Sequence, residues 1–433
     1  MSDTAGAPRP VSPGTARNLL IVLTFVNLFN YLDRYVVPAI ANSLKTALGL
    51  SFTQIGLLGT GFIVVYAIAS PQFGRLGDKR NRPRLIALGV AIWSIATVLG
   101  GFAWGFISLL VARAIMGIGE AAYGSIAPSL LADAFPKEKR GRMFSIFFAA
   151  IPIGSALGFV VATQVDHHFG WRSAFLIAGG PGIILALLLL RMKEIPRGAQ
   201  DGGDDTHLHH AAPAGTTGWA TYAGLLANRT YVITVAGYAA YTFALGALSF
   251  WMVYFLVNMR GVPETVAGGQ IGTIAVLTGI VGTFAGGWLG DYLLKYTRHA
   301  YLLMSGVATL LAVPFTIIML TAATPAIYLG ALVVAELLMF ASTGPVNSAI
   351  INAVAPGERA TAMAFSILMM HLLGDAPSPW IVGWIADVAK NAGNSEGIAL
   401  QHGLMVLPIA IFVSGVIWTM GGLRKDRNPG GAR

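Results

Sequence analysis

Twelve mostly apolar stretches, each of about 20 residues or more, follow one another along the sequence. Helices of this length cross a bilayer, because a helix satisfies all of its backbone polar groups internally. Only 11% of the residues are charged, against about 25% in a soluble domain. The sequence therefore predicts an all-α membrane protein with twelve transmembrane helices. The expected spans are 18–46, 51–78, 84–104, 106–133, 138–167, 171–192, 229–259, 263–294, 299–321, 325–354, 358–388 and 398–423.

The positively charged residues are divided unevenly between the two sides of the predicted bundle. Of the 28 Lys and Arg residues, 21 lie on the side that holds both termini and four on the opposite side. Loops rich in Lys and Arg stay in the cytoplasm. We therefore expect a multi-pass protein of the inner (plasma) membrane with both termini cytoplasmic. The net charge of +9 follows from this topology and does not indicate nucleic-acid binding.

Two short motifs recur in the two halves of the chain. Gly-x-Leu-Gly-Asp ends the second span at Asp78 and the eighth at Asp291, 213 residues later. Phe-Ser-Ile begins at Phe144 and again at Phe365. Two parallel repeats of six helices are typical of a transporter with its site between the halves. The predicted parts are a cytoplasmic tail (1–17), an N-terminal six-helix bundle (18–192), a cytoplasmic linker (193–228), a pseudo-symmetric C-terminal six-helix bundle (229–423) and a cytoplasmic tail (424–433).

Four charged residues lie within the first and fourth spans: Asp33, Arg34, Arg113 and Glu120. A charge at the bilayer centre costs roughly 2.5–3.5 kcal/mol on insertion scales, so such residues are usually paired or functional. Arg113 and Glu120 are seven residues apart and share one helix face. We predict that Asp33 and Glu120 couple transport to protons, while Arg34 and Arg113 are counter-charges or bind an anionic headgroup. The alternative is a permanently paired structural cluster.

A second group of candidate residues lies in spans seven and ten. Glu336 has no basic neighbour within one helical turn, so we expect it to be protonated or to face water in the cavity. Tyr241 belongs to an apolar face of span seven that is suited to an acyl chain. Phe340 and Asn347, seven residues apart, are expected to face the same cavity as Glu336. All four are candidate substrate-binding residues, although aromatic residues in membrane helices also serve packing alone.

The sequence carries no motif for a cofactor, a metal or an enzymatic nucleophile. Nothing matches Gly-x-x-x-x-Gly-Lys-Ser/Thr, so we expect transport driven by gradients and not by ATP. The absence of cysteine excludes disulfides and thiolate metal sites. His207, His209 and His210 lie in the polar linker, where we expect no metal site. The predicted protein is not an enzyme and needs no cofactor.

Several motifs resemble those of known transporters. Gly74–Arg84 resembles the loop between spans two and three of the major facilitator superfamily, and Arg113–Glu120 resembles the motif of its fourth span. Within that superfamily, Asn30–Arg34 and His371–Pro379 resemble the Spinster subfamily in its bacterial form. The resemblance extends over essentially the whole chain. It implies a substrate such as a lysophospholipid or sphingosine phosphate.

The superfamily resemblance also bears on span eleven, which supports the cavity in that fold and does not line it. His371 and Asp375 lie four residues apart on one helix face, so they can hydrogen-bond to each other. We therefore expect this pair to couple structural elements.

The loop after span two is expected to form a conformational latch, made when the cytoplasmic side is closed and broken when it opens. Asp78 can accept hydrogen bonds from the first amides of a neighbouring helix or pair with Arg142. In the second half Asp291 repeats the acid with fewer basic residues around it, so that latch should be weaker. The predicted latch residues are Gly74, Asp78, Arg82, Arg142 and Asp291.

These observations predict a secondary active transporter that works by alternating access. We expect it to be coupled to protons, to move an anionic or zwitterionic amphiphile such as a lysophospholipid, and to act as a monomer among membrane lipids. A proton-coupled carrier of a hydrophilic organic acid or a drug-like solute is the first alternative. The second is a membrane-embedded lipid enzyme that uses Asp33, Glu120 and His371 as acid–base groups.

Overall fold

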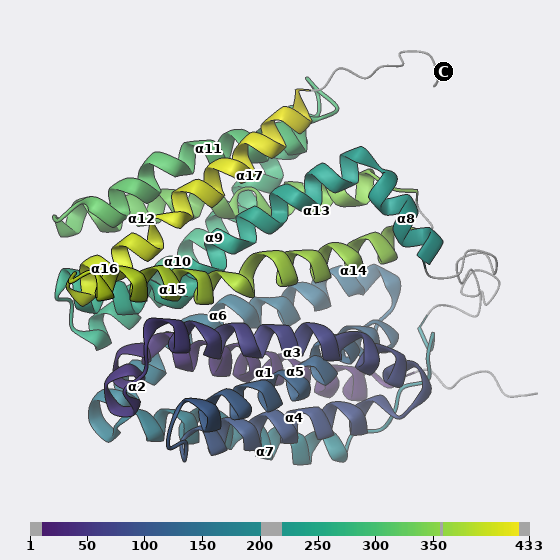
Figure 1. The fold of residues 1–433 in the computed structure, drawn as a ribbon. Helices are drawn as coiled ribbons and strands as arrows, with labels where there is room; N and C mark the ends of the chain where they lie inside the picture. Colours follow the sequence, from purple (N-terminus) through teal and green to yellow (C-terminus); the bar gives the residue numbers. More distant parts are fainter. Residues whose placement is uncertain (1–10, 201–218, 356–357, 424–433) are drawn as a thin grey trace, which may run out of the picture. The chain divides into compact units, whose positions relative to one another are not determined.

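The structure, a computed structural model, describes residues 11–200, 219–355 and 358–423, and within these ranges it is helical with no β-strand (Figure 1). Eleven described helices are long and apolar enough to cross a membrane. The remaining predicted span, 358–388, is present as two α-helices joined by a π-helical turn. The predicted all-α membrane fold is therefore confirmed. Parts of the predicted tails (1–10 and 424–433) and of the linker (201–218, with its three histidines) lie outside the described residues.

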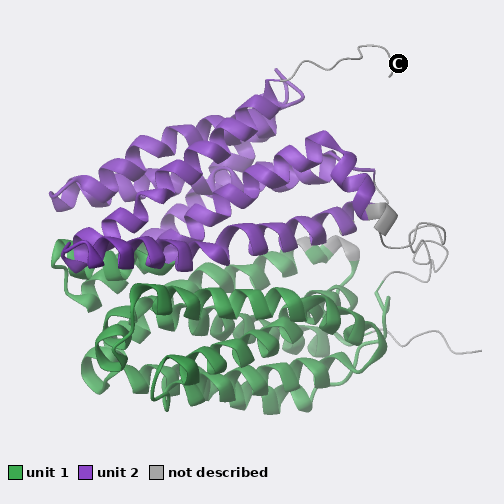
Figure 2. Ribbon diagram, viewed as in Figure 1, with its two compact units in different colours: residues 1–210, 250–273 green, residues 211–249, 274–433 purple. Residues whose placement is uncertain are grey.

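The chain forms two compact units (Figure 2). Unit 1 comprises residues 1–210 and 250–273, and unit 2 comprises 211–249 and 274–433. The sequence did not predict that the second part of span seven and the start of span eight would join unit 1. Aromatic packing explains this division: the Phe52 ring lies 6.0 Å from the ring of Trp251 and 5.5 Å from that of Tyr254.

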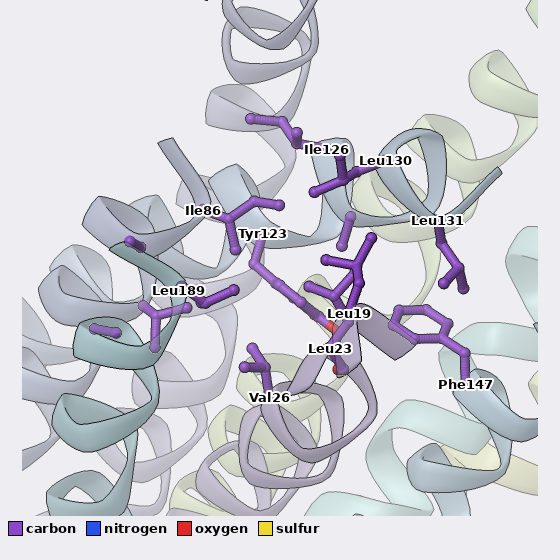
Figure 3. Packing of buried hydrophobic residues seen from close by; sticks show 14 of the residues in the cluster. Leu19, Leu23, Val26, Ile86, Tyr123, Ile126, Leu130, Leu131, Phe147 and Leu189 are labelled. Carbon is purple, nitrogen blue, oxygen red and sulfur yellow. Dashed lines mark hydrogen bonds between the residues drawn. The ribbon is translucent and has the colours of Figure 1, made fainter. Parts of the chain in front are cut away.

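The described part of unit 1 contains seven helices together with parts of two more. In this unit α1 packs on α6, and α5 packs on α3 and α4. Its interior contains the side chains labelled in Figure 3, which come from five helices. The helices are α1 (Pro13–Ala39), α2 (Ala41–Leu48), α3 (Phe52–Lys79), α4 (Arg82–Gly100), α5 (Phe106–Ala134), α6 (Lys137–Phe169) and α7 (Trp171–Leu190).

Close helix contact in unit 1 depends on paired glycines. A Cβ on Gly119 of α5 would lie 2.5 Å from the carbonyl oxygen of Gly89 and 2.6 Å from the amide nitrogen of Trp93, both on α4. Inside a membrane, apolar burial does not favour helix association over lipid contact, so close packing of small residues has to do so. Only glycine fits here, and it brings α5 close enough to α4 to fix the position of Glu120, the next residue.

The start of α3 is fixed by local hydrogen bonds. The Ser51 hydroxyl accepts from the Gln54 amide at 3.2 Å, and the Gln54 side chain accepts from the Ser51 amide at 3.0 Å. This capping box satisfies amides that the first turn of a helix cannot pair. Gly49, with φ of 64°, turns the chain from α2 toward this cap. The register of α3 that follows sets the positions of Phe62 and Tyr66.

Unit 2 is built from the remaining helices, among which α11 packs on α12 and α17. A short helix, α8, lies at 219–227, inside the segment predicted to be a linker; its apolar sequence allows a helix too short to span the membrane. Span ten is interrupted between α12 and α13. The helices are α8 (Trp219–Ala227), α9 (Arg229–Arg260), α10 (Glu264–Leu293), α11 (Ala300–Thr321), α12 (Pro325–Phe340), α13 (Thr343–Asn352), α14 (Arg359–Met370), η2 (His371–Asp375), α15 (Pro377–Asn391), α16 (Glu396–Leu404) and α17 (Val406–Gly422), with α9 and α10 shared between the units.

Candidate functional site

An ion pair joins α1 to α5 inside unit 1. The Nε of Arg34 donates to Oε2 of Glu120 at 2.6 Å. The Glu120 side chain is fully buried, whereas the Arg34 side chain is 20% exposed. Arg34 is therefore the member of the pair that a solute can reach.

Three aromatic rings surround the guanidinium of Arg34. Its central carbon lies 4.9 Å from the ring centres of both Tyr31 and Tyr66, and 5.2 Å from that of Phe62. The negative faces of such rings attract a cation. We call Arg34 with Tyr31, Phe62 and Tyr66 the arginine cage. It holds the guanidinium in position independently of Glu120.

Asp33, the residue before Arg34, is buried on another side of α1. Its Oδ2 accepts a hydrogen bond from the Thr97 hydroxyl of α4 at 3.3 Å, and its Oδ1 has no hydrogen-bond partner among the described residues. The carboxyl group borders a cavity of about 10 Å³, also lined by Arg113 and Phe175. The volume of this space is roughly that of one water molecule, and the polar residues in its mostly apolar lining are Asp33, Thr97 and Arg113.

Arg113 is buried within unit 1 and is not ion-paired to an acid among the described residues. Its guanidinium carbon lies 4.7 Å from the ring centre of Phe62, and its Nε donates to the Leu58 carbonyl at 3.4 Å. The ring of Phe62 is thus near both guanidiniums. Of the four charged residues, Arg34 and Glu120 form the one direct ion pair recorded among the described residues.

The sequence indicated the four charged residues but not the groups that hold them. Tyr31 and Tyr66, the Phe62 ring and the Thr97 hydroxyl were not predicted. Tyr31 belongs to the motif Asn30–Arg34 and could have been found there, three residues before Arg34 on the same helix face. Nothing in the sequence indicates that Phe62, Tyr66 and Thr97, which come from other helices, lie beside the charges.

Two of the candidate substrate residues of unit 2, Glu336 and Tyr241, are buried and hydrogen-bonded to neighbouring helices. Glu336 is buried, and its Oε2 lies 2.8 Å from the Thr278 hydroxyl. Tyr241 is also buried, and its hydroxyl donates to the Met339 carbonyl at 2.9 Å. In this structure Tyr241 therefore contacts span ten through its hydroxyl group.

Phe340 and Asn347 lie on either side of the interruption in span ten, and both are partly exposed. The side-chain amide of Asn347 donates to the Thr343 carbonyl of its own helix at 2.8 Å. This bond leaves its oxygen for another partner. Both side chains stay candidates for substrate contact.

The predicted contact between His371 and Asp375 is present. The His371 Nδ1 lies 3.0 Å from both carboxylate oxygens of Asp375. The two residues begin and end η2, the π-helical turn, which packs on α9: a Cβ on Gly246 would lie 2.6 Å from the Cβ of Asp375. Their arrangement fits the expected structural role, and π turns are frequent at functional sites.

The predicted latch residues have different contacts in this structure. Arg82 is buried and binds Asp133 at the end of α5 (2.5 Å) and Glu194 after α7 (2.8 Å), which ties three parts of unit 1 together. Asp78 and Arg142 are exposed, and no ion pair joins them in the described chain. In unit 2 Asp291 accepts from the Tyr301 hydroxyl at 2.8 Å, and in unit 1 Gly74 has open space at its Cβ position.

No group of three potential metal ligands occurs within the ranges that the structure describes. The polar residues of unit 1 provide a partly exposed cation, a buried carboxylate bound to it, and a second buried carboxylate beside a small cavity. Such a site can exchange protons and hold an anion.

Comparison with known proteins identifies the family. Residues 23–379 match the Major Facilitator Superfamily. Human Protein spinster homolog 1 is 34% identical over 418 residues, covering 92% of this chain and 78% of that protein. Protein spinster of Drosophila melanogaster is 33% identical, covering 84% and 61%.

Solved structures agree on the fold. A bacterial homolog of the human lysosomal transporter Spinster, inward-facing and unoccupied, superimposes with a TM-score of 0.85 at 24% identity, covering 95% of this chain and 98% of that one. The D-xylose–proton symporter gives 0.72 at 16% identity, covering 93% and 97%. These structural matches agree with the twelve-helix fold. The chain belongs to the Major Facilitator Superfamily and, within it, is a multi-pass membrane transporter of the Spinster type.

Proposed function

We propose that this protein couples proton movement to alternating-access transport of an amphiphile with an anionic or zwitterionic headgroup, such as a lysophospholipid. The observation that carries the proposal is the position of Arg34, which is bound to the buried Glu120, held in the arginine cage and 20% exposed. The proposed location is the inner (plasma) membrane with both termini in the cytoplasm, in keeping with the distribution of Lys and Arg.

The coupling follows from the pairing of Arg34 with Glu120. When Glu120 takes up a proton, the ion pair is lost and Arg34 keeps its charge. A cation left without its partner in a low-dielectric site is costly, about 3–5 kcal/mol for a buried pair. An anionic headgroup that replaces the carboxylate removes that cost. Proton binding at Glu120 and anion binding at Arg34 therefore favour each other.

Asp33 and Arg113 form the second part of the proposed mechanism. Asp33 and Arg113 both line a space of about one water molecule, and Oδ1 of Asp33 has no hydrogen-bond partner among the described residues. Water entering this space would give Asp33 a route for proton exchange, and Arg113 would then act as its counter-charge. Asp33 and Glu120 are the proposed proton-coupling residues.

The lysolipid substrate rests on membership of the Spinster proteins and on the resemblance of their motifs. The proposed further contacts with substrate in unit 2 are Tyr241, Glu336, Phe340 and Asn347. The latch made by Asp78, Arg142 and their neighbours is proposed to form in another conformation from the one described. The protein is also proposed to act as a monomer.

Sealed liposomes with an internal pH dye test the proposal. Lysophospholipid or a hexuronate is added under a small pH gradient to the wild type and to Asp33→Asn with Glu120→Gln. Glu396→Gln is the matched control, since Glu396 pairs with Lys390 on the surface at 3.0 Å. We expect proton flux with lysophospholipid in the wild type and control but not in the double variant.

Other outcomes decide between the alternatives. Flux with the hexuronate alone would contradict the lipid substrate and favour a carrier of hydrophilic acids. Unchanged flux in the double variant would contradict the proton-coupling role of Asp33 and Glu120. Chemical conversion of lysophospholipid in detergent, where no second compartment exists, would favour a lipid enzyme.

A further inference from the structure

Glu336 and Thr278 form the one polar contact between α12 and α10 that involves a carboxyl group in the described part of unit 2. The Thr278 hydroxyl lies 2.8 Å from Oε2 of Glu336 and 2.7 Å from the Ile274 carbonyl oxygen of its own helix. A hydroxyl group has one proton to donate. It can therefore donate to the Ile274 carbonyl or to Glu336, but it cannot fully serve both acceptors.

A proton on Glu336 resolves this conflict. The Thr278 hydroxyl then donates to Ile274, as threonine commonly does inside a helix, and accepts a hydrogen bond from the carboxylic acid of Glu336. Both contacts are satisfied at the observed distances. With an ionised Glu336, one of the two short contacts would bring together two acceptors without a proton between them.

The surroundings of Glu336 also favour the neutral acid. Glu336 is only 6% exposed. The helix α11, which packs on α12, contains no Asp, Glu, Lys, Arg or His, and α9 and α10 carry theirs only in their first and last turns. The titratable side chain that reaches α12 from α9 is the phenol of Tyr241, bound to the Met339 carbonyl. No cation in the described part of these helices offsets a charge on Glu336, and an unpaired buried charge neutralises instead.

The same contact lies beside the interruption of span ten. The helix α12 ends at Phe340 and α13 begins at Thr343. The face of α10 that carries Thr278 also carries Gly282 and Gly286, at four-residue spacing. A Cβ on Gly282 would lie 2.7 Å from the Leu337 carbonyl oxygen, and one on Gly286 would overlap the backbone of Ala341. One face of α10 therefore contacts both the acid and the interruption.

We propose that Glu336 is a second proton-binding site, in the C-terminal half of the chain. In the conformation described it holds a proton and donates it in a hydrogen bond to Thr278. Loss of that proton leaves a carboxylate with no cation beside it in these described helices, and Thr278 can donate to it only by giving up its bond to the Ile274 carbonyl. We expect this change to release α10 from span ten at the interruption. The ligand of the site is a proton, and the site goes beyond the coupling proposed for Asp33 and Glu120 because it needs neither of them.

Infrared spectroscopy of the purified protein in detergent, without substrate or gradient, tests the protonation directly. The carbonyl stretch of a protonated carboxylic acid is separate from the bands of a carboxylate. At neutral pH we expect the wild type to show one such acid band that Glu336→Gln lacks, and we expect it to disappear as the pH is raised. Identical spectra in this region would overturn the proposal.

The same spectra in an Asp33→Asn, Glu120→Gln background separate this site from the proposed transport mechanism. The band assigned to Glu336 should persist there. A band that vanishes in that background would assign the proton to unit 1 and overturn the proposal. Neither result depends on whether the protein carries a lysophospholipid.

Cross-linking tests the effect on helix packing. The chain contains no cysteine, so Gly287→Cys with Gly344→Cys introduces the only two thiols; a Cβ on Gly344 would lie 3.8 Å from the Cα of Gly287. The Glu336→Gln side chain can donate to Thr278 at every pH, so this variant is the matched control for the reactivity of the thiols themselves. We expect cross-linking to fall at least about twofold with rising pH relative to the Glu336→Gln background. Superimposable profiles would contradict the release of α10.

Discussion

The two units keep an acidic side chain inside the membrane by different means. In unit 1 Glu120 is bound to Arg34, which three aromatic rings also hold. In unit 2 Glu336 has only the Thr278 hydroxyl as a polar partner in the described chain. The first arrangement contains a cation that protonation can release toward an anion, whereas the second contains none. The two units therefore surround their buried acids with different polar partners.

The largest expected effect comes from removing the cation of unit 1. Arg34→Gln leaves Glu120 buried without a counter-charge, which should reduce the free energy of unfolding by about 3–5 kcal/mol. Adding Glu120→Gln should recover part of this loss. Thermal unfolding of both variants in one detergent measures the difference. Equal instability of the single and double variants would show that the pair is not what stabilises this region.

In unit 2 the packing of α10 should matter more than any charge. Gly286→Ala forces a methyl group into the backbone of Ala341, and overpacking of this kind costs about 1–3 kcal/mol. The control is Gly287→Ala, one residue along, where a Cβ meets nothing within 4 Å. Unfolding temperatures provide the comparison. Similar values for both alanine variants would contradict the close contact with span ten.

The Phe62 ring, near both guanidiniums, should have an intermediate effect. Phe62→Leu keeps an apolar side chain but removes cation–π contacts worth about 0.5–2 kcal/mol. We expect weaker binding of an anionic amphiphile, by about fivefold, with little change in stability. Phe102→Leu is the control, because Phe102 is exposed. Equal affinities of the Phe62→Leu and Phe102→Leu variants for the amphiphile would contradict a role of Phe62 in binding.

The smallest expected effect concerns a surface pair. Lys390→Gln breaks the contact with Glu396, and exposed ion pairs contribute about 0–1 kcal/mol. Stability and transport should both stay near wild type. A large loss of stability or transport would mean that removing a charge at any position is harmful. The different surroundings of Glu120 and Glu336 would then not explain the effects of the other variants.

The sequence predicted the helices well because a membrane imposes their length and their apolar character. It also placed Arg113 and Glu120 on one face of α5, and His371 beside Asp375, since spacing within one helix determines such pairs. It could not choose between the possible partners of Arg34. That choice depends on the rotation of α1 against α3 and α5, which side chains from three helices set together.

Other features of the fold could not be predicted because the local sequence carries no signal for them. The π turn at His371–Asp375 has no pattern of its own in an apolar helix. The packing of Trp251 and Tyr254 on Phe52 joins residues about 200 positions apart, so no local signal reveals it. The short helix α8 was missed because its polar surroundings indicated a linker.

The central claim is that an anion at Arg34 and a proton at Glu120 bind together. The most direct test is proton uptake when lysophospholipid is added to the purified protein in weakly buffered detergent. The wild type should take up protons as it binds, and Glu120→Gln should bind at least as tightly without taking up as many. Binding by the wild type with no proton uptake, or uptake unchanged in Glu120→Gln, would contradict the account.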